Sequence, residues 1–206
     1  MALLYQSVPA PENEKRDVDD LQQTAADAAA GDPLAAARLV RETQSDVWRL
    51  CAALGDPGSA DDLTQETYLR AFGSLHRFEG RSSVRTWLLS IARRVCADAV
   101  RSRRRRRLTL VRDVADVEPA VPGQDADRVA EGVAVDDLLA RLAPDRREAF
   151  VLTQLLGLPY AEAAEVAGCP VGTIRSRVAR ARGDLIAALA DDGAGTGGSE
   201  QRRTGI

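Results

Sequence analysis

The sequence contains few of the residues on which most catalytic and metal sites depend. It has one histidine, His76, three cysteines without a Cys-x-x-Cys pair, no phosphate-binding glycine loop and no Ser/His/Asp arrangement. A lone histidine has no second imidazole with which to share a metal, and widely spaced cysteines are typical of buried thiols in a reducing compartment. We therefore expect neither an enzyme nor a protein with a metal or other cofactor.

Aromatic residues and long apolar runs are also scarce. Aromatics make up 4% of the 206 residues, and alanine supplies much of the 45% hydrophobic fraction, so any core is small and helical. No run approaches the roughly 20 apolar residues that cross a membrane. The start MALLYQSV lacks the basic residues of a signal peptide. These absences predict a soluble, cytoplasmic protein with an all-α fold.

The net charge of −3 conceals a strong segregation of charge. Residues 77–107 include eleven arginines against two acids, whereas residues 113–137 include eight acids against one arginine. The five consecutive arginines at 103–107 repel one another in water and are typical of a surface that binds a polyanion. A disordered basic linker is the alternative interpretation of this run.

The stretch from Pro170 to Leu185 is the most informative. Its apolar residues recur at steps of three and four and share one helix face: Val171, Ile174, Val178, Ala181 and Leu185. The opposite face and its flanks carry hydroxyls and arginines: Thr173, Arg175, Ser176, Arg177, Arg180 and Arg182. A short helix over 160–167 precedes it and ends at Gly168, as a tight turn between helices favours. Together they predict a DNA-binding helix-turn-helix; a surface helix with solvated arginines is the alternative.

Apolar periodicity predicts further helices over 24–30, 34–54, 59–75 and 84–101, and another that opens at Pro144 and closes at Gly157. Ser59 has the character of a capping-box residue for the third of these. That helix has an inward face made of Leu63, Thr67, Tyr68, Ala71, Phe72 and Leu75. Its outward stripe consists of Asp62, Gln65, Glu66 and Leu69. On periodicity alone this stripe is equally a solvated face.

Three segments, in this order, resemble the extracytoplasmic-function (group IV) class of bacterial sigma factors. They are DDLTQETYLRAF at 61–72, FEGRSSVRTWLLSIARRVCAD at 78–98 and LPYAEAAEVAGCPVGTIRSRVARAR at 158–182. The resemblance implies two small helical domains joined by an acidic flexible linker at 108–132. A sigma2-like bundle would cover 21–107 and a sigma4-like helix-turn-helix domain 133–190. Residues 1–20 and 191–206 are expected to be disordered.

The resemblance also implies roles for individual residues. Positions that hold the RNA polymerase core match Asp62, Gln65, Glu66 and Leu69. Those at the −10 element match Phe78, Arg81, Ser82, Ser83, Trp87, Arg93, Arg94 and Arg101. Those at the −35 element match Thr173, Arg175, Ser176, Arg177 and Arg180. Because Phe78 and Trp87 are the segment's only aromatics for stacking unpaired bases, we expect limited melting power and a demanding promoter requirement.

The favoured hypothesis is a promoter-specificity subunit that starts transcription of a stress- or envelope-type regulon. Its implied partners are the largest-subunit coiled coil and the flap of core polymerase, promoter DNA and an anti-sigma factor. A free-standing helix-turn-helix regulator is the first alternative, although it leaves residues 61–107 unexplained. A pure interaction protein, such as a sigma-like decoy, is the second.

Overall fold

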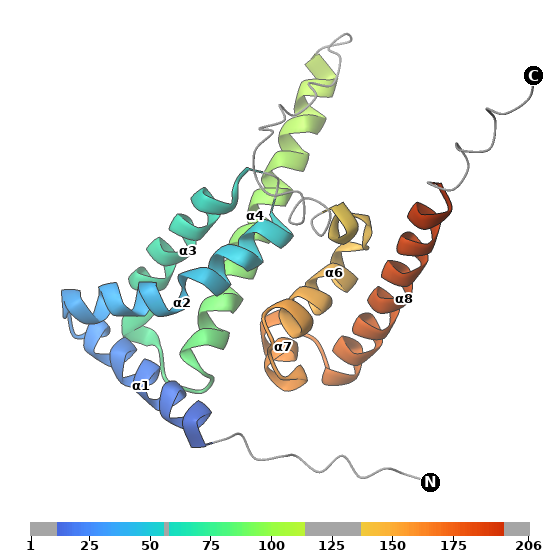
Figure 1. The fold of residues 1–206 in the computed structure, drawn as a ribbon. Helices are drawn as coiled ribbons and strands as arrows, with labels where there is room; N and C mark the ends of the chain where they lie inside the picture. The colour runs from blue at the N-terminus through green and yellow to red at the C-terminus, as the bar shows by residue number, and fades with distance from the viewer. Residues whose placement is uncertain (1–11, 56–57, 114–136, 196–206) are drawn as a thin grey trace, which may run out of the picture.

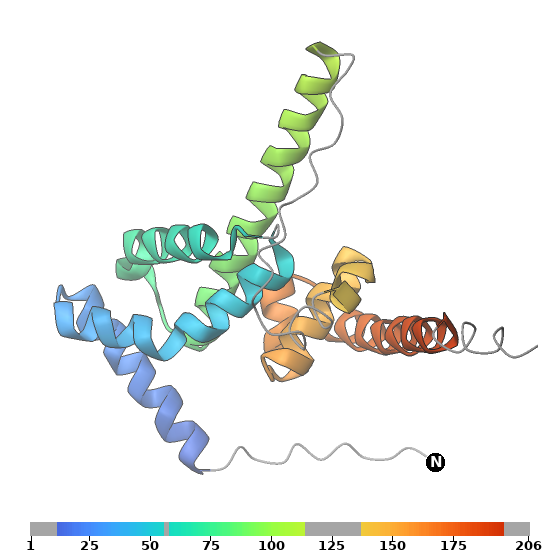
Figure 2. The ribbon, with the colours of Figure 1, turned by 45° about the horizontal axis from the view of Figure 1, so that its top comes forward.

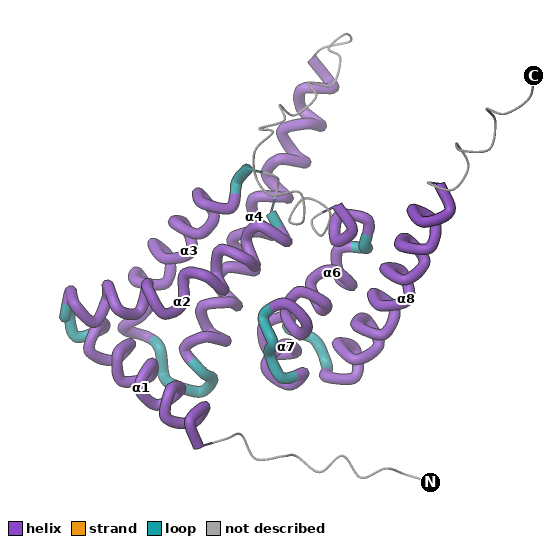
Figure 3. Tube along the Cα trace, viewed as in Figure 1, coloured by secondary structure: helices purple, strands orange, loops and turns teal. Residues whose placement is uncertain are grey.

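The computed structural model describes residues 12–55, 58–113 and 137–195 of the chain (Figure 1). Within these ranges the backbone forms helices joined by short turns and contains no strand, as Figure 3 shows. The prediction of an all-α fold is confirmed.

The helices form two groups along the chain. The first is a bundle of α1 (Glu12–Ala29), α2 (Pro33–Leu54), α3 (Ala60–Ser74) and α4 (Val84–Asp113), with a 3-10 turn, η1 (Leu75–Arg77), after α3. The second contains α6 (Pro144–Phe150), η2 (Val151–Leu155), α7 (Tyr160–Ala167) and α8 (Val171–Gly195). Most of the predicted acidic linker lies outside the described residues.

The break between α1 and α2 follows from three consecutive residues. Gly31 has a φ of 98°, Pro33 begins α2, and the Asp32 carboxylate accepts a 2.8 Å hydrogen bond from the Leu34 N–H. Proline at the first helical position sacrifices no hydrogen bond, and an aspartate cap satisfies an otherwise free amide. The predicted break at this point is confirmed.

The core of the first bundle comes from the facing sides of α2, α3 and α4. Its buried members include Leu39, Val47, Leu50, Leu63, Val84, Leu88, Leu89 and Val95. One predicted core residue, Phe72, is instead 37% exposed; its ring lies against that of Tyr68, with centroids 6.2 Å apart.

Ser59 precedes α3 but makes no side-chain capping hydrogen bond, so the predicted capping box is wrong. Its φ of −100° and ψ of 1° lie outside the extended conformation that directs an N-cap side chain toward the first amides. The Ser59 carbonyl accepts the Leu63 N–H at 3.0 Å instead.

Three helices extend beyond their predicted ends. α1 begins at Glu12, α4 continues through the arginine run to Asp113, and α8 continues to Gly195. The structure therefore differs from the predicted disorder or linker over residues 12–20, 108–113 and 191–195. Once a helix has formed, each further residue adds a hydrogen bond at low cost, and arginine is a good helix former. The rest of the predicted disordered ends lies outside the described residues.

The second group forms the predicted helix-turn-helix. Gly168 ends α7 in the left-handed conformation with a φ of 65°, and its N–H bonds back to the last turn of the helix. Ile174, Val178 and Ala181 of α8 are fully buried, as the periodicity predicts. Val171 is 40% exposed, contrary to the prediction, because it is the first residue of α8 and lies at the end of the buried stripe.

The helix expected to run from Pro144 to Gly157 is divided in two. α6 passes into η2, which has π-helical hydrogen bonding, and Gly157 then ends the segment with a φ of 69°. A π turn widens the helix locally, so the side chains that follow it are rotated relative to α6.

The two groups pack against each other. α7 lies against α4, and α6 lies against α2. Figure 2 shows that the C-terminal part of α4 projects away from the body of the molecule. Across the described ranges, no helix combines the length and apolarity needed to span a membrane.

Candidate nucleic-acid interface

Two hydroxyl residues fix the start of α4. The Ser83 hydroxyl oxygen accepts the Thr86 backbone N–H at 3.1 Å and donates to the Thr86 Oγ1 at 2.8 Å. The first of these bonds is that of an N-cap. Ser83, which the resemblance assigns to the −10 loop, is therefore also the residue that positions the helix behind that loop.

An aromatic pair closes the loop before α4. The rings of Phe78 and Trp87 lie with centroids 5.0 Å apart and planes at 44°, and both pack against the core of the bundle. Arg81 is exposed and pairs with Glu79 at 2.7 Å, while Ser82 is half-buried. The loop thus gathers a tilted aromatic pair and a cation at one end of α4.

The three arginines predicted on α4 have different environments. Arg94 is exposed. Arg101 donates to Asp98 at 2.6 Å, and Asp98 also accepts from Arg70 of α3 at 3.0 Å. Hydrogen bonds from Arg70 and Arg101 hold the pKa of the Asp98 carboxyl below its ordinary value. Arg93 instead pairs with Glu148 of α6 and is half-buried.

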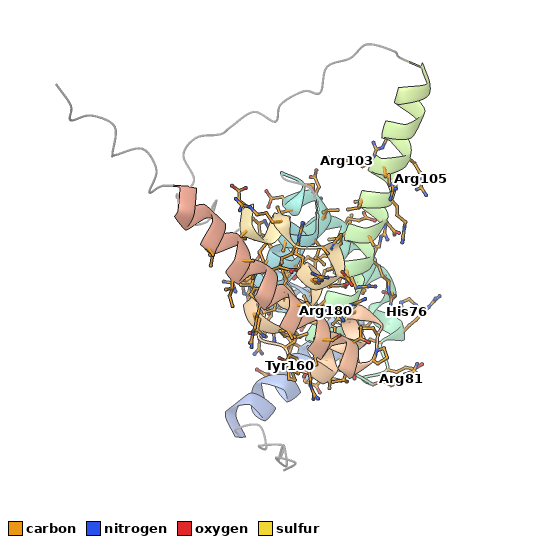
Figure 4. The ribbon with its side chains drawn as sticks, turned by 90° about the vertical axis from the view of Figure 1, so that its right-hand side faces the viewer. His76, Arg81, Arg103, Arg105, Tyr160 and Arg180 are labelled. Carbon is orange, nitrogen blue, oxygen red and sulfur yellow. The ribbon has the colours of Figure 1, made fainter. Side chains whose placement is uncertain are left out.

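The arginine run lies on the projecting part of α4. The side chains at 103–106 are exposed, and Figure 4 shows Arg103 and Arg105 on that part of the helix, remote from Arg81. A helical rod of exposed guanidinium groups suits contact with successive backbone phosphates. Together with Arg94, it gives α4 a basic surface along much of its length.

The predicted DNA-reading face of α8 is largely accessible. Arg175, Ser176 and Arg180 are exposed, and Figure 4 shows Arg180 on the outer side of α8. The Ser176 hydroxyl donates to the Thr173 carbonyl at 2.9 Å. Arg177 is half-buried, because it pairs with Asp145 at 3.3 Å and donates to the Cys169 Sγ at 3.7 Å.

The predicted polymerase-binding stripe lies on the outer face of α3. Asp62 and Gln65 are exposed, and Leu69 is 63% exposed. Glu66 pairs with Arg70 of the same helix at 2.7 Å. The exposed Leu69 side chain is surrounded by acidic and amide groups. Such a surface is complementary to a protein partner that offers apolar and basic side chains.

Trp48 is an exposed aromatic that the periodicity does not assign to any site. It is 43% exposed, its Nε1 donates to Asp61 at 2.8 Å, and it lines with Gln65 a cleft of about 630 Å³ between α2 and α3. Trp48 directly follows the buried Val47 and so lies beside the buried stripe of α2. A large aromatic residue next to a buried stripe is the sequence signal that could have identified this surface. Trp48 enlarges the candidate protein-binding surface of α3.

The described residues thus form an all-helical protein with exposed arginines on two separate helices and an acidic outer face on α3, as expected of a nucleic-acid-binding protein. Matches to known families agree with this class. Residues 39–106 match Sigma-70 region 2, and residues 132–185 match Sigma-70, region 4.

Relatives of known sequence carry the same assignment. The ECF RNA polymerase sigma factor SigC of Mycobacterium tuberculosis is 55% identical over 166 residues, which cover 78% of this chain and 86% of that protein. The ECF RNA polymerase sigma factor EcfG of Rhodopseudomonas palustris is 40% identical over 140 residues, which cover 68% and 76%. The chain belongs to the extracytoplasmic-function family of sigma factors and is a promoter-specificity subunit of bacterial RNA polymerase.

Solved structures of relatives share the fold. CnrH, in complex with the cytosolic domain of CnrY, is 30% identical with a TM-score of 0.63, over 82% of this chain and 96% of that one. RpoE of Bartonella quintana, in complex with the anti-sigma factor NepR, is 29% identical with a TM-score of 0.58, over 74% and 95%. The free-standing regulator is therefore not favoured.

Proposed function

We propose that the chain divides promoter recognition between its two helical groups. The loop before α4 and the basic face of α4 read the −10 element, using Phe78, Arg81, Ser82, Ser83, Trp87, Arg93, Arg94 and Arg101. The face of α8 reads the −35 element, using Thr173, Arg175, Ser176, Arg177 and Arg180. The observation that carries this proposal is the pair of exposed basic helix faces on two separate helical groups.

The outer face of α3 binds core polymerase in this proposal. Leu69 supplies an exposed apolar contact, and Asp62, Gln65 and Glu66 supply the polar surroundings. The chain contributes specificity and the polymerase performs the chemistry, so the chain itself is not an enzyme. Since core polymerase and promoter DNA lie in the cytoplasm, we place the chain there too.

An anti-sigma factor is a further proposed partner. The solved structure of RpoE, to which this chain is similar, contains an anti-sigma factor. An anti-sigma factor that covers the faces of α3 or α4 would hold this chain away from polymerase or from promoter DNA.

Transcription from a randomised promoter library tests the proposal. Purified core polymerase and the full chain are supplied with templates that are random upstream of the start site, and the run-off transcripts are sequenced. We expect two enriched motifs at a constant spacing, near −10 and −35. Stable binding to the core without any transcript would indicate a decoy. Absence of both binding and transcript would favour the free-standing helix-turn-helix regulator instead.

A further inference from the structure

We infer that α1 forms one wall of the −10-reading site and that the Gln22 side-chain amide selects one unpaired base there. The base carries an exocyclic amine beside a ring nitrogen, so it is adenine or cytosine. It lies in a cleft between α1 and the −10 loop, residues 78–83 before α4. This inference rests on the proposed function, which assigns the loop to the −10 element and gives α1 no part in DNA binding.

One face of α1 lines the cleft. The lining residues of this helix stand at positions i, i+3, i+4 and i+7, on one side of it: Gln22, Ala25, Ala26 and Ala29. Because alanine carries only a methyl group, this face leaves space between α1 and the loop. The cleft has a volume of about 230 Å³. Sites for drug-sized ligands measure roughly 300–1,000 Å³, so this cleft suits a single base.

The other side of the cleft comes from the loop and η1. Phe78, Glu79 and Gly80 line it, together with the buried Leu75. Phe78 supplies an aromatic ring, and every base has a π face that can stack on such a ring. The cleft therefore combines an apolar lining with a small number of polar groups, as sites that orient a small ligand do.

The Gln22 amide lies against the loop with its hydrogen-bonding groups unused. Gln22 is half-buried, and among the residues that the structure describes none forms a hydrogen bond with this amide. Gly80 has a φ of 70°, and a Cβ on it would lie 2.8 Å from the Gln22 Nε2. A glycine at this position thus allows the amide to approach the loop. The two donors and the acceptor of the amide remain available to a ligand.

The two polar side chains of the cleft favour a base that carries an amine. A glutamine amide binds adenine through N6 and N7, and a carboxylate accepts a hydrogen bond from the cytosine N4 amine. Glu79 pairs with Arg81 at 2.7 Å, but an ionised carboxylate has acceptor sites for more than one donor. Thymine and guanine instead present the carbonyl oxygens O4 and O6, which a carboxylate repels. Adenine and cytosine are therefore preferred.

The experiment compares two neighbouring glutamines of α1. Gln22→Leu removes the amide and keeps a side chain of similar length. Gln23→Leu is the matched control, because Gln23 is exposed and donates to Asp27 at 2.8 Å. Holoenzyme containing each full-length chain is tested by competition binding against all single-base variants of the selected −10 element. We expect Gln22→Leu to reduce the preference for adenine or cytosine at one position by about fivefold or more, and Gln23→Leu to keep the wild-type pattern.

Two further measurements test the cleft itself. Ala26→Leu adds bulk at an exposed position of the lining face and should remove the preference at the same base. A promoter with a base analogue that lacks the exocyclic amine at that position should bind wild-type holoenzyme less tightly. The same analogue should not weaken the Gln22→Leu holoenzyme further, because the two changes remove one shared interaction.

The outcomes separate this inference from the proposed function. Unchanged −10 preferences in both Gln22→Leu and Ala26→Leu, beside a wild type that selects a −10 motif, would overturn the inference and leave the proposed function intact. A uniform loss of affinity at every position would also overturn it, since Gln22 would then support the loop without reading a base. A wild-type holoenzyme that selects no −10 motif refutes the proposed function and the inference with it.

Discussion

The rings of Phe78, directly after η1, and of Trp87, in the first turn of α4, form a tilted pair with centroids 5.0 Å apart and planes at 44°. Such a pair contributes roughly 0.5–1.5 kcal/mol beyond simple burial. It lies in the segment to which the proposed function assigns −10 recognition, where it is the aromatic surface for stacking an unpaired base.

We predict that Phe78→Leu lowers transcription from duplex promoters about three- to tenfold. This factor corresponds to the free energy that the pair of rings contributes. A template whose −10 region is already unpaired should restore most of the activity, since strand opening is then no longer required. Phe150→Leu, at a half-buried phenylalanine of the second group, is the control and should affect neither template. Equal loss on duplex and unpaired templates would show that the pair has no part in opening.

The arginines of α8 should differ in what they read. We predict that Arg175→Ala or Arg180→Ala costs about 1–3 kcal/mol of holoenzyme affinity and relaxes the preference at one −35 base if the side chain contacts that base. Affinity is measured by competition among all single-base variants of the selected promoter. Arg182→Ala is the control, because Arg182 donates to Gln154 at 2.7 Å and lies outside the predicted set. A uniform loss over all variants would identify a phosphate contact instead.

Leu69 should matter for binding to core polymerase. We predict that Leu69→Asp weakens this binding at least about tenfold, because an apolar anchor is replaced by a charge that must be desolvated. Leu34→Asp introduces the same change at a leucine that is 79% exposed on α2, away from the proposed surface, and should bind normally. Surface plasmon resonance with immobilised core measures both. Equal affinity of the two variants would remove α3 from the proposed interface.

A buried hydroxyl pair stabilises the first bundle. The hydroxyl oxygens of Thr43 and Tyr68 lie 2.7 Å apart and away from solvent. We predict that Thr43→Val lowers the free energy of unfolding by about 1–3 kcal/mol, because the buried Tyr68 hydroxyl loses this partner. Tyr68→Phe should cost less, because the Thr43 hydroxyl still donates to the Leu39 carbonyl at 2.7 Å. The double variant should cost less than the sum. Both tryptophans, Trp48 and Trp87, lie in this bundle, so urea unfolding followed by their fluorescence reports on it. Strict additivity would contradict the pairing.

The cysteines should divide into one reactive and two protected thiols. Cys51 and Cys96 are buried, and Cys169 is half-buried. A hydrogen bond with Cys51, together with burial, raises the pKa of the Cys96 thiol, so it stays protonated and unreactive at pH 8. We predict that Ellman's reagent labels one thiol in the native chain and three after unfolding. Cys169→Ser should abolish the native reaction; three fast thiols in the native wild type would contradict the packing.

Much of the fold follows from local signals in the sequence. The glycine and proline at Gly31 and Pro33, the Gly168 turn and the stripe of Ile174 and Val178 are local patterns, and the structure has each where the pattern predicts it. Helix ends were less predictable, because propagation of a formed helix carries α4 through residues that have no apolar period.

The contacts between the two groups could not be predicted from local pattern. Arg93 and Glu148 are 55 residues apart, and Thr86 and Glu162 are 76 apart, so no periodicity links them. Exposure of Phe72 and Trp48 likewise depends on which helix covers each face, which is a tertiary property. The roles assigned to the arginines come from family resemblance and from exposure rather than from spacing alone.

Site-specific photocross-linking of the promoter complex tests the central claim most directly. A photoreactive amino acid is placed at position 94 on α4 or at position 180 on α8, and each holoenzyme is irradiated on the selected promoter. We predict cross-links at the −10 element from position 94 and at the −35 element from position 180. Cross-links from both positions to the same element, or to DNA outside both, would contradict the division of promoter recognition between the two helices.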